Sequence, residues 1–222
     1  MERYFIIDKF NTFYDWNLIL TSKSVTPPEP KTNYVNIDGR DGTLDLSESL
    51  TGGITYKDRT ITATFWTDVG NRNDRARLLR DITAKLHGKK VHIIEPDDPD
   101  HYFVGRVVIK AVNNLLAYTS FTIEAICEPW RYSINEIVRT IFVDDESLSL
   151  VINNNGVKTL CPDITVSENG YIYLECDGLE DYGELEGGYT YRDSNVKIKP
   201  GVNIFILRGY GEVSIRYREA DL

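Results

Sequence analysis

A strict alternation of residue types in two stretches constrains the fold of this chain more than any other feature. In RTITATFW, residues 59–66, the apolar residues Ile61, Ala63 and Phe65 alternate with threonines. In FTIEAIC, residues 121–127, apolar residues again occupy every second position. A period of two is expected of a β-strand that has one buried face and one wet face. The sequence therefore predicts a sheet protein with these two stretches as strands.

Further strand-like runs fill most of the chain. The first half contains YFII, WNLIL, KVHIIE and FVGRVVI, with turn residues between them. The part after residue 135 contains seven runs: IVRTIFV, LSLVI, ITVS, YIYLE, VKIK, NIFIL and EVSIRYR. Turns that contain Asn, Gly or Pro separate these seven runs, including GYG at residues 209–211. Short strands at such spacing predict an antiparallel sandwich without a helix.

One segment breaks this pattern, and it predicts a helix. NDRARLLRDITAKLHG, residues 73–88, offers Asn73 or Asp74 as N-cap and Gly88 as a left-handed C-cap. Its apolar residues recur at spacings of three and four, which places them on the core side: Leu78, Leu79, Ile82 and Leu86. The opposite face is expected to meet solvent or a neighbouring subunit: Arg75, Arg77, Arg80, Asp81 and Lys85.

The distribution of charge divides the chain into two parts. The whole chain of 222 residues has a formal charge of −9, but residues 1–135 carry a net −1 and residues 136–222 a net −8. The length allows two modest domains, and we place a boundary near residue 135. No diffuse basic field is available to hold a nucleic-acid backbone, so sequence-specific binding of nucleic acid is not expected.

Cysteine usage and hydropathy indicate where the protein is made. Cys127, Cys161 and Cys176 are widely spaced and include no C-x-x-C pair, so we expect three buried thiols in a reducing compartment. No run approaches the roughly 18 apolar residues that a membrane span requires. The sequence predicts synthesis and folding in the cytoplasm and no membrane segment.

Signatures of catalysis are missing from the sequence. The nucleophile elbow, the P-loop, the dinucleotide-binding glycine pattern and the H-E-x-x-H zinc motif are all absent. With 34 acidic residues, a pair of carboxylates at the spacing of a glycoside hydrolase is expected by chance. We expect neither an enzyme nor a cofactor.

The stretch NIDGRDGTLDLS, residues 36–47, has the aspartates and glycines of a calcium loop but not their spacing. Aligning Asp41 and Gly42 with positions 5 and 6 of an EF-type loop leaves Ile37 and Gly39 where ligands are required, so the metal is rejected. Asp-Gly occurs twice, and glycine takes positive φ without steric cost. We expect two tight turns that present Arg40 and Asp41 at a corner.

Two other acidic stretches are expected to be loops. EPDDPDHY, residues 95–102, is flanked by His92 and contains His101, but Asp and Pro are the residues that hairpin loops favour. ECDGLEDYGELEGG, residues 175–188, contains six acids and no Lys or Arg. A solvated loop is the simpler interpretation of residues 175–188, and a calcium-binding rim stays open as the alternative.

Taken in order, the motifs of the first half resemble those of a known protein family. PEPKTNYVNIDGRDGTLDLSESLTGGITYKDRTITATF, then LHGKKVHIIEPDDPDHYFVGRVVI, then FTIEAICEPWRY resemble the N-terminal domain of the distal tail proteins of siphovirus-type bacteriophages and prophages. In the second half, VINNNGVKTLCPDITVS and KIKPGVNIFILRGYGEVSIRYRE resemble the galectin-like sandwich that many of these proteins carry. The stretch ECDGLEDYGELEGGYTYRDS follows no pattern of the family.

The resemblance implies a mainly β protein with a structural role in the virion. Residues 1–135 would be a β-sandwich or split-barrel-like domain with one α-helix that forms a ring, and residues 136–222 a galectin-like antiparallel β-sandwich. Six copies would form a baseplate hub at the tail tip. The hub would stack on the tail tube protein, hold the tail-associated lysin or spike hub protein, contact receptor-binding proteins, and leave a lumen through which DNA passes. Arg40 and Asp41, together with Arg59, are expected to contribute to the contact between copies.

An alternative function is carbohydrate binding by the second half. Tyrosine faces stack on sugar rings, and this region carries Tyr171, Tyr173, Tyr182, Tyr189, Tyr191 and Tyr210. Under this hypothesis Tyr189 and Tyr191 would contact a glycan of the host cell wall. A simpler interpretation is that Tyr171 and Tyr173 line one face of an ordinary strand.

Overall fold

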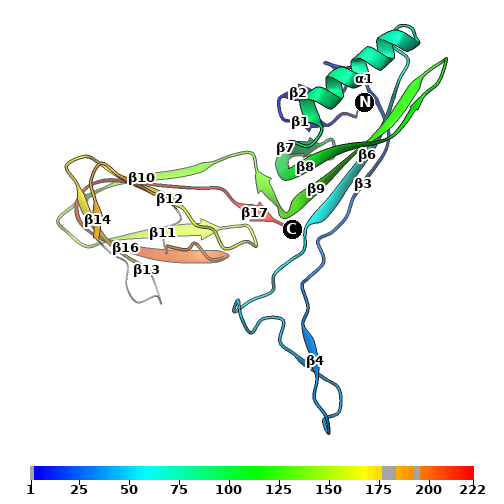
Figure 1. Ribbon diagram of the computed structural model, residues 1–222. Helices are drawn as coiled ribbons and strands as arrows, with labels where there is room; N and C mark the ends of the chain where they lie inside the picture. The colour runs from blue at the N-terminus through cyan, green and yellow to red at the C-terminus, as the bar shows by residue number, and fades with distance from the viewer. Residues whose placement is uncertain (1–2, 177–183, 193–195) are drawn as a thin grey trace. The chain divides into compact units, whose positions relative to one another are not determined.

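The computed structural model describes residues 3–176, 184–192 and 196–222, and it divides the chain into two compact units (Figure 1). Unit 1 comprises Met1–Arg131 together with Leu222, and unit 2 comprises Tyr132–Asp221. In the described residues both units are built of strands, and unit 1 holds the one α-helix. These observations confirm the mainly β class with one helix.

Unit 1 contains a curled sheet in the order β2-β1-β7-β8-β9-β6-β3. Its strands are β1 (Ile6–Ile7), β2 (Phe10–Asn11), β3 (Ile19–Val25), β6 (Arg59–Thr67), β7 (Lys90–Glu95), β8 (Asp98–Asn114) and β9 (Thr119–Ser133). The two alternating stretches of the sequence form β6 and β9, which pair in antiparallel register with Ile61 opposite Ala125 and Phe65 opposite Phe121. Alternate residues of both strands are buried, so the predicted period of two is confirmed.

Helix α1 (Arg72–Leu86) packs its apolar side into the core of unit 1. Ile82 and Leu86 are buried, and Leu78 and Leu79 are partly buried against the same core, as the spacing predicts. Gly88 has φ +77°, which confirms the left-handed residue after the helix.

The predicted N-cap of α1 was wrong by two or three residues. Asn71 is the cap: its side chain accepts hydrogen bonds from the backbone N–H groups of Asn73 and Asp74. The Asp74 side chain in turn accepts a hydrogen bond from the Asn71 N–H at 3.1 Å, which completes a capping box. Asp74 therefore occupies the third helical position of the box and is not the cap itself.

A long excursion between β3 and β6 carries a separate two-stranded sheet. β4 (Tyr34–Asn36) pairs with β5 (Thr43–Asp45), and neither belongs to the main sheet. The hydrogen bonds from Lys31 N–H to Thr55 O and from Lys57 N–H to Glu29 O, 2.7 and 2.8 Å long, tie the two sides of the excursion together. We call residues 26–58 the arm; in Figure 1 it extends beyond the ends of β3 and β6.

The turn between β7 and β8 is tighter than the predicted loop over residues 95–102. Glu95 is paired with Asp98, so the turn itself consists of Pro96 and Asp97. His101 and Asp98 form a contact of 2.7 Å between Nδ1 and Oδ1, and Arg131 donates to the other oxygen of Asp98 at 3.2 Å. This acidic stretch is a hairpin turn, as predicted.

Unit 2 is antiparallel and is organised around β16 (Gly201–Tyr217). The other strands after residue 135 are β10 (Ile137–Asp144), β11 (Leu148–Asn154), β12 (Asp163–Val166), β13 (Tyr171–Cys176), β14 (Glu184–Glu186), β15 (Thr190–Tyr191) and β17 (Ala220–Asp221). Residues up to Tyr210 of β16 pair with β11 and β13, and residues from Tyr210 onward pair with β10 and β12. One strand therefore takes part in four ladders, two on each side of Tyr210.

The prediction of a turn at GYG, residues 209–211, was wrong. NIFIL and EVSIRYR belong to the same strand, and Gly209 and Gly211 lie inside it with φ +116° and +126°. Only glycine adopts such φ values readily, so the two glycines let the strand bend where it changes partners. VKIK is not a strand either, since it contributes only the isolated bridge of Ile198 to Leu160.

The acidic stretch of residues 175–188 is only partly a loop. Its beginning lies on β13, and Glu184–Glu186 form β14, which pairs with Tyr171–Tyr173 of β13. Residues 177–183 lie outside the described part of the chain, so the calcium-binding alternative stays untested. Among the described residues, no His, Cys, Asp or Glu side chains form a cluster of three that could hold a metal ion.

Candidate interaction surfaces

The end of the arm presents the corner that the sequence predicts. Gly39 and Gly42 have φ +82° and +73°, and no atom lies within 4 Å of where a Cβ would be. Glycine is therefore needed at both positions for the positive φ, and not to make room for a neighbouring atom. Arg40 donates its N–H to Ile37 O at 3.1 Å, and both Arg40 and Asp41 are exposed.

Local hydrogen bonds fix the strand that returns from this corner. Ser47 donates its backbone N–H to Asp45 Oδ1 at 2.9 Å, and its hydroxyl also bonds to that carboxylate. The same hydroxyl accepts the Asn33 N–H at 2.9 Å, which joins both sides of the arm. The hydrogen bonds from Ser47 lower the pKa of Asp45, so this carboxylate is charged at neutral pH and holds the turn.

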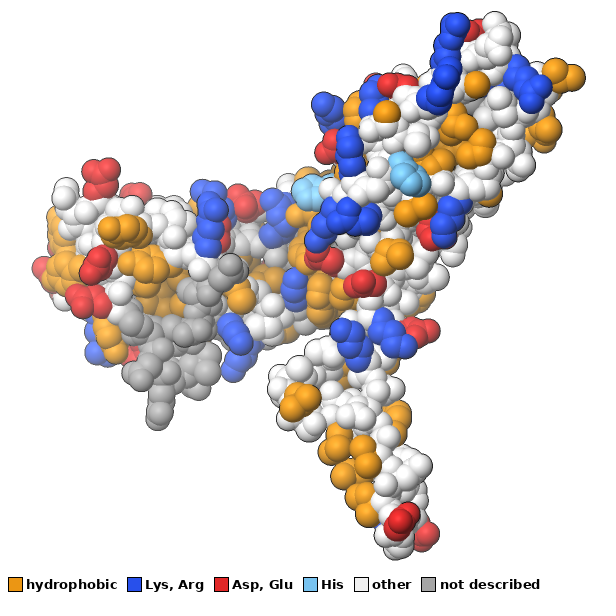
Figure 2. Space-filling view, viewed as in Figure 1, with side chains coloured by type: hydrophobic (Ala, Val, Ile, Leu, Met, Phe, Trp, Pro, Cys, Tyr) orange, Lys and Arg blue, Asp and Glu red, His pale blue; other side chains and the backbone are white. Residues whose placement is uncertain are grey.

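The arm exposes apolar side chains along its length, as Figure 2 shows. The large ones that are exposed are Tyr34, Val35, Ile37, Leu50 and Ile54. None of them belongs to the core cluster of unit 1. A thin hairpin cannot bury these side chains by itself, so the arm has the character of a contact surface.

Arg59, the third residue expected at a contact between copies, occupies a different environment. It is the first residue of β6, its relative exposure is 5%, and its guanidinium lies 5.1 Å from the centre of the Phe103 ring. Burial lowers the pKa of Arg59, and the nearby charge of Arg131 acts in the same direction. Its Nε and Nη2 have no hydrogen-bond partner in the described part of the chain. Its role at a contact stays a prediction.

The tyrosines of unit 2 fall into two groups. Tyr171 and Tyr173 lie on the exposed face of β13 and alternate with the buried Ile172 and Leu174, which confirms the simpler interpretation of that pair. Tyr210 is opposite Tyr171 on β16 and is also exposed. Tyr182 lies outside the described residues.

The second group contains the two residues expected at a glycan. Tyr189 is exposed just before β15, with a relative exposure of 60%. Tyr191 is partly buried, and its hydroxyl accepts the Glu186 N–H at 2.7 Å. The Tyr191 hydroxyl therefore serves the local structure, whereas the Tyr189 side chain meets solvent.

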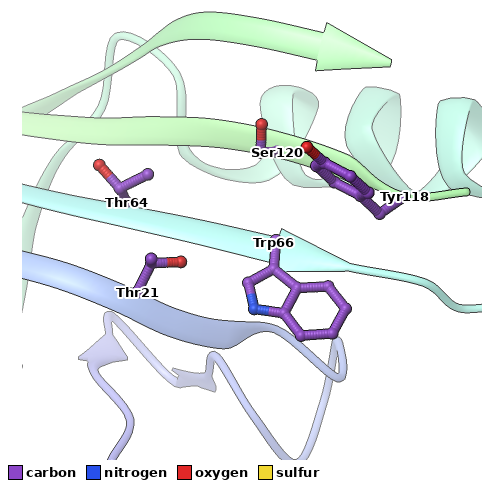
Figure 3. Close-up of a pocket in the computed structure, with 5 residues that line it drawn as sticks. All are labelled: Thr21, Thr64, Trp66, Tyr118 and Ser120. Carbon is purple, nitrogen blue, oxygen red and sulfur yellow. The ribbon is translucent and has the colours of Figure 1, made fainter. Parts of the chain in front are cut away.

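A shallow hollow on the main sheet of unit 1 was not anticipated from the sequence. It has a volume of about 500 Å³ and is lined by Thr21 on β3, Thr64 and Trp66 on β6, Tyr118, and Ser120 on β9. The rings of Trp66 and Tyr118 meet edge to face with centroids 6.4 Å apart. Figure 3 shows these two rings at one end of the hollow and the three hydroxyl-bearing residues on neighbouring strands. We call it the Trp66 hollow.

Arg75 is a second surprise, because the sequence places it on the solvated face of α1. Its relative exposure is 2%, so that prediction was wrong. Its guanidinium donates to the backbone oxygens of Gly70, Leu115 and Leu116 at 2.9, 3.0 and 2.7 Å. These acceptors come from loops on either side, which a helical spacing does not encode.

Comparisons with known proteins agree with this architecture. The family model described as the phage tail protein RIFT-related domain matches residues 12–127, which is more than half of the chain. The crystal structure of the Dit (gp 19.1) protein of phage SPP1, described as a paradigm of the hub adsorption apparatus in phages that infect Gram-positive bacteria, superposes with a TM-score of 0.72. That likeness covers 99% of each chain at 17% sequence identity, so it concerns the fold.

A search of curated protein sequences finds no match. No described helix has the length and apolar character that a membrane crossing demands. Family and fold together point to a structural phage tail protein. The chain belongs to the family of phage tail proteins that carry the RIFT-related domain.

Proposed function

We propose that this protein is the distal tail protein of a siphovirus-type phage or prophage and that six copies close into a ring at the tail tip. The observation that carries the proposal is the combination of the tail-protein family match with a whole-chain likeness to the SPP1 Dit fold. The ring joins the tail tube to the tip apparatus and leaves a lumen for DNA.

The arm is the part of unit 1 that we assign to the contact between copies. It presents Arg40 and Asp41 at its turn and a row of exposed apolar side chains behind them. A contact in which the arm of one copy meets a different surface of the next is heterologous, and heterologous contacts generate closed rings. The apolar row supplies affinity, and the charged pair fixes the register.

Electron micrographs of the purified protein test the ring. We expect six-fold particles with a central hole, and mass photometry should give about six copies per particle at micromolar concentration. Arg40→Ala and Asp41→Ala should each weaken the ring, by roughly tenfold if each side chain has a charged partner. Lys197→Ala, at an exposed site in unit 2, is the matched control. Rings that withstand both arm substitutions would show that the corner is only a turn.

The lumen is proposed to lack a strongly basic lining. Residues 1–135 carry a net charge of only −1, and passing DNA must not be held by its phosphates. A ring map with a lumen dominated by Lys and Arg would contradict this part of the proposal.

The proposed partners follow from the position of the ring. The tube protein lies on one side, the tail-associated lysin or spike hub protein on the other, and receptor-binding proteins are further candidates. Co-expression followed by affinity capture should recover the tube protein and the lysin hub with the ring. Their absence from complexes that contain an intact ring would contradict the assigned position.

Carbohydrate binding by unit 2 is the second candidate, because Tyr189 and the face formed by Tyr171, Tyr173 and Tyr210 are exposed. Aromatic faces of this kind stack on sugar rings. Binding to a host cell wall preparation that Tyr189→Ala and Tyr191→Ala abolish would support it. Equal retention of the wild type and both variants, or no retention at all, would exclude these residues from such a site.

A further inference from the structure

Arg59 is a buried arginine to which the fold of unit 1 gives too few acceptors. It begins β6 on the same buried side of the strand as Ile61, and its relative exposure is 5%. Nε and Nη2 of its guanidinium are both buried, and neither has a hydrogen-bond partner within the described ranges of the chain. Burying a polar group without a partner costs free energy, and burying a charge costs more, so this side chain requires an explanation.

The two nitrogens without partners belong to one edge of the guanidinium. Nε–H and Nη2–H lie parallel on this edge, and their spacing matches two oxygens of a carboxylate or a phosphate group. The guanidinium also lies over the ring of Phe103, with Cζ 5.1 Å from the ring centre. The ring contact positions the guanidinium and does not use the donors of the edge, so these are available to a ligand.

Another buried arginine of unit 1 is bonded quite differently. Arg75 has a relative exposure of 2%, and its guanidinium donates to three backbone oxygens and to the hydroxyl of Thr119. Arg59 has no comparable set of acceptors in the part of unit 1 that the structure describes. We therefore expect the acceptor for Arg59 to come from outside the fold of this chain.

The acidic groups around Arg59 do not neutralise it. Glu95 acts on Arg59 through its charge, but its carboxylate forms an ion pair with Lys23. Cys127, which is opposite Arg59 on β9, stays protonated at neutral pH because burial raises the pKa of its thiol to about 12. The surrounding side chains therefore leave Arg59 without a counter-charge.

Arg131 is a second cation beside Arg59, and it extends to the surface. Burial is the main cause that lowers the pKa of Arg59, and the positive charge of Arg131 adds to it. Arg131 Nη1 donates to Asp98 at 3.2 Å, but its buried Nε has no described partner. The side chain of Arg131 is 39% exposed, which gives an anion access from solvent. An anion that contacts both arginines would offset their mutual repulsion.

We propose that Arg59 and Arg131 form a binding site for an oxyanion. A carboxylate or phosphate group accepts the two N–H donors on the Nε–Nη2 edge of Arg59, and Arg131 contributes a second positive charge. The proposal goes beyond the function proposed above, because it needs only unit 1 and neither the ring nor the tyrosines of unit 2.

Thermal melts of the full chain in sodium phosphate test the site. The three tryptophans report unit 1, and sodium chloride at equal ionic strength separates binding from screening. We expect phosphate to raise the melting temperature in a saturable way, by roughly 3 °C or more at saturation. Arg59→Met keeps a long side chain over Phe103 and should lose this response. Arg59→Lys should keep only a small part of it, because an ammonium group lacks the two parallel donors.

Arg77→Met is the matched control, since the side chain of Arg77 is 74% exposed. It should keep the phosphate response of the wild type. Without phosphate, Arg59→Met should melt no lower than the wild type, because it removes a buried charge that has no partner. A clearly lower melting temperature would mean that Arg59 is already satisfied in the folded chain, and would contradict the proposal. So would a wild type that responds equally to phosphate and chloride, or an equal phosphate response in Arg59→Met.

Sedimentation with and without phosphate identifies the source of the anion. Self-association that phosphate leaves unchanged would identify a free anion as the ligand. Self-association that both phosphate and Arg59→Met weaken would identify a carboxylate of a second copy. Both results support an oxyanion site, provided that the melts show binding. Six-fold particles are scored separately in micrographs, so the ring can fail without the site, and the site without the ring.

Discussion

Arg75 shows how a buried charge can be held without a carboxylate. Its guanidinium meets three carbonyl oxygens and one hydroxyl, and within the described residues no acid is paired with it. Carbonyl dipoles that converge on a planar donor satisfy its N–H groups and offset part of the desolvation cost. Arg75 therefore joins the loop before α1 to the end of the β8–β9 hairpin through hydrogen bonds to both.

Replacing Arg75 should therefore destabilise unit 1 severely. We predict that Arg75→Ala lowers the free energy of unfolding by about 3–5 kcal/mol, because it removes four hydrogen bonds and leaves a void. The three tryptophans Trp16, Trp66 and Trp130 all lie in unit 1, so their fluorescence in urea reports this unit.

The neighbouring helical arginine provides the control for that experiment. The side chain of Arg77 is 74% exposed and only loosely paired with Asp74 at 3.7 Å. Arg77→Ala should change stability by no more than about 0.5 kcal/mol. If the two substitutions had equal effects, the hydrogen bonds of Arg75 would not be what stabilises the loops.

The thiol of Cys127 is another buried side chain of unit 1. Burial raises the pKa of its thiol to about 12, against the opposing effect of the Arg59 charge. Its Sγ lies 2.3 Å from where a Cβ on Gly105 would be, so the two strands approach closely there. Cys161, in contrast, is exposed, and the expectation of three buried thiols was wrong for that residue.

The two thiols should differ strongly in reactivity. At pH 8 we predict that a thiol reagent labels Cys161 quickly and Cys127 only on unfolding, because only a thiolate that solvent can reach reacts. Mass spectrometry of tryptic peptides would show the order, and Cys161→Ser should abolish the fast phase. Rapid labelling of Cys127 in that variant would contradict its burial.

The same shift predicts a loss of stability in alkali. The unfolded thiol releases its proton near pH 9, whereas the folded one retains it until about pH 12. Between these values the folded state binds more protons than the unfolded state, so the contribution of Cys127 to stability falls as pH rises.

At the scale of elements, the strands and the helix that depend on local periodicity were predictable. β6 and β9 follow from the alternation of residues, and α1 follows from its apolar stripe and Gly88. The N-cap was missed because Asn71, Asn73 and Asp74 are all good capping residues, and only the backbone path decides among them. Element boundaries depend on such contacts more than on composition.

In the second half of the chain, prediction from local sequence alone gave a wrong element. GYG reads as a hairpin turn, yet Gly209 and Gly211 bend one continuous strand. A signal was present: the residues buried on β16 are odd-numbered on both sides of the glycines, from Asn203 to Tyr217. One continuous strand is expected to keep the same alternation of buried and exposed residues throughout. Two strands joined by a turn need not bury residues of the same parity.

The bend in β16 should tolerate no side chain at Gly209. A Cβ there would lie 2.2 Å from Tyr171 O, in addition to the strain of φ +116°. We predict that Gly209→Ala lowers the stability of unit 2 by about 3 kcal/mol or more, measured by calorimetry.

Gly201 is a control that distinguishes backbone strain from the steric clash at Gly209. Gly201 opens the same strand with φ +88°, and nothing lies within 4 Å of its Cβ position. Gly201→Ala should therefore lower the stability of unit 2 by only about 1–2 kcal/mol, because it introduces backbone strain without a clash. Equal losses for the two variants would mean that strand β13 moves aside at Tyr171.

For the whole molecule, the division into two units predicts separable unfolding. Arg75→Ala should lower the temperature of the transition that tryptophan fluorescence reports, and Gly209→Ala should lower the other transition in calorimetry. If each substitution shifted both transitions equally, the units would unfold as one cooperative body.

The candidate surfaces were predictable only in part. The turn at Arg40 and Asp41 follows from two Asp-Gly pairs, because a glycine turn is a local property. The Trp66 hollow combines side chains of β3, β6 and β9 with Tyr118, which are up to about a hundred positions apart in sequence, so its formation depends on the sheet order. The end of the β8–β9 hairpin had a signal in the ten uncharged residues 111–120, but its hydrogen bonds to Arg75 could not be predicted from the sequence.

The place of β16 in unit 2 has a consequence for the order in which the protein folds on the ribosome. This strand bonds to β10, β11, β12 and β13, and it comprises residues 201–217. The earlier strands of unit 2 remain unpaired with their main neighbour until β16 has left the exit tunnel, whereas residues 1–131, which are all of unit 1 except Leu222, are synthesised long before. Their edges are exposed to aggregation during this interval. Nascent chains stalled before residue 200 should therefore be protease-resistant in unit 1 and digestible in unit 2.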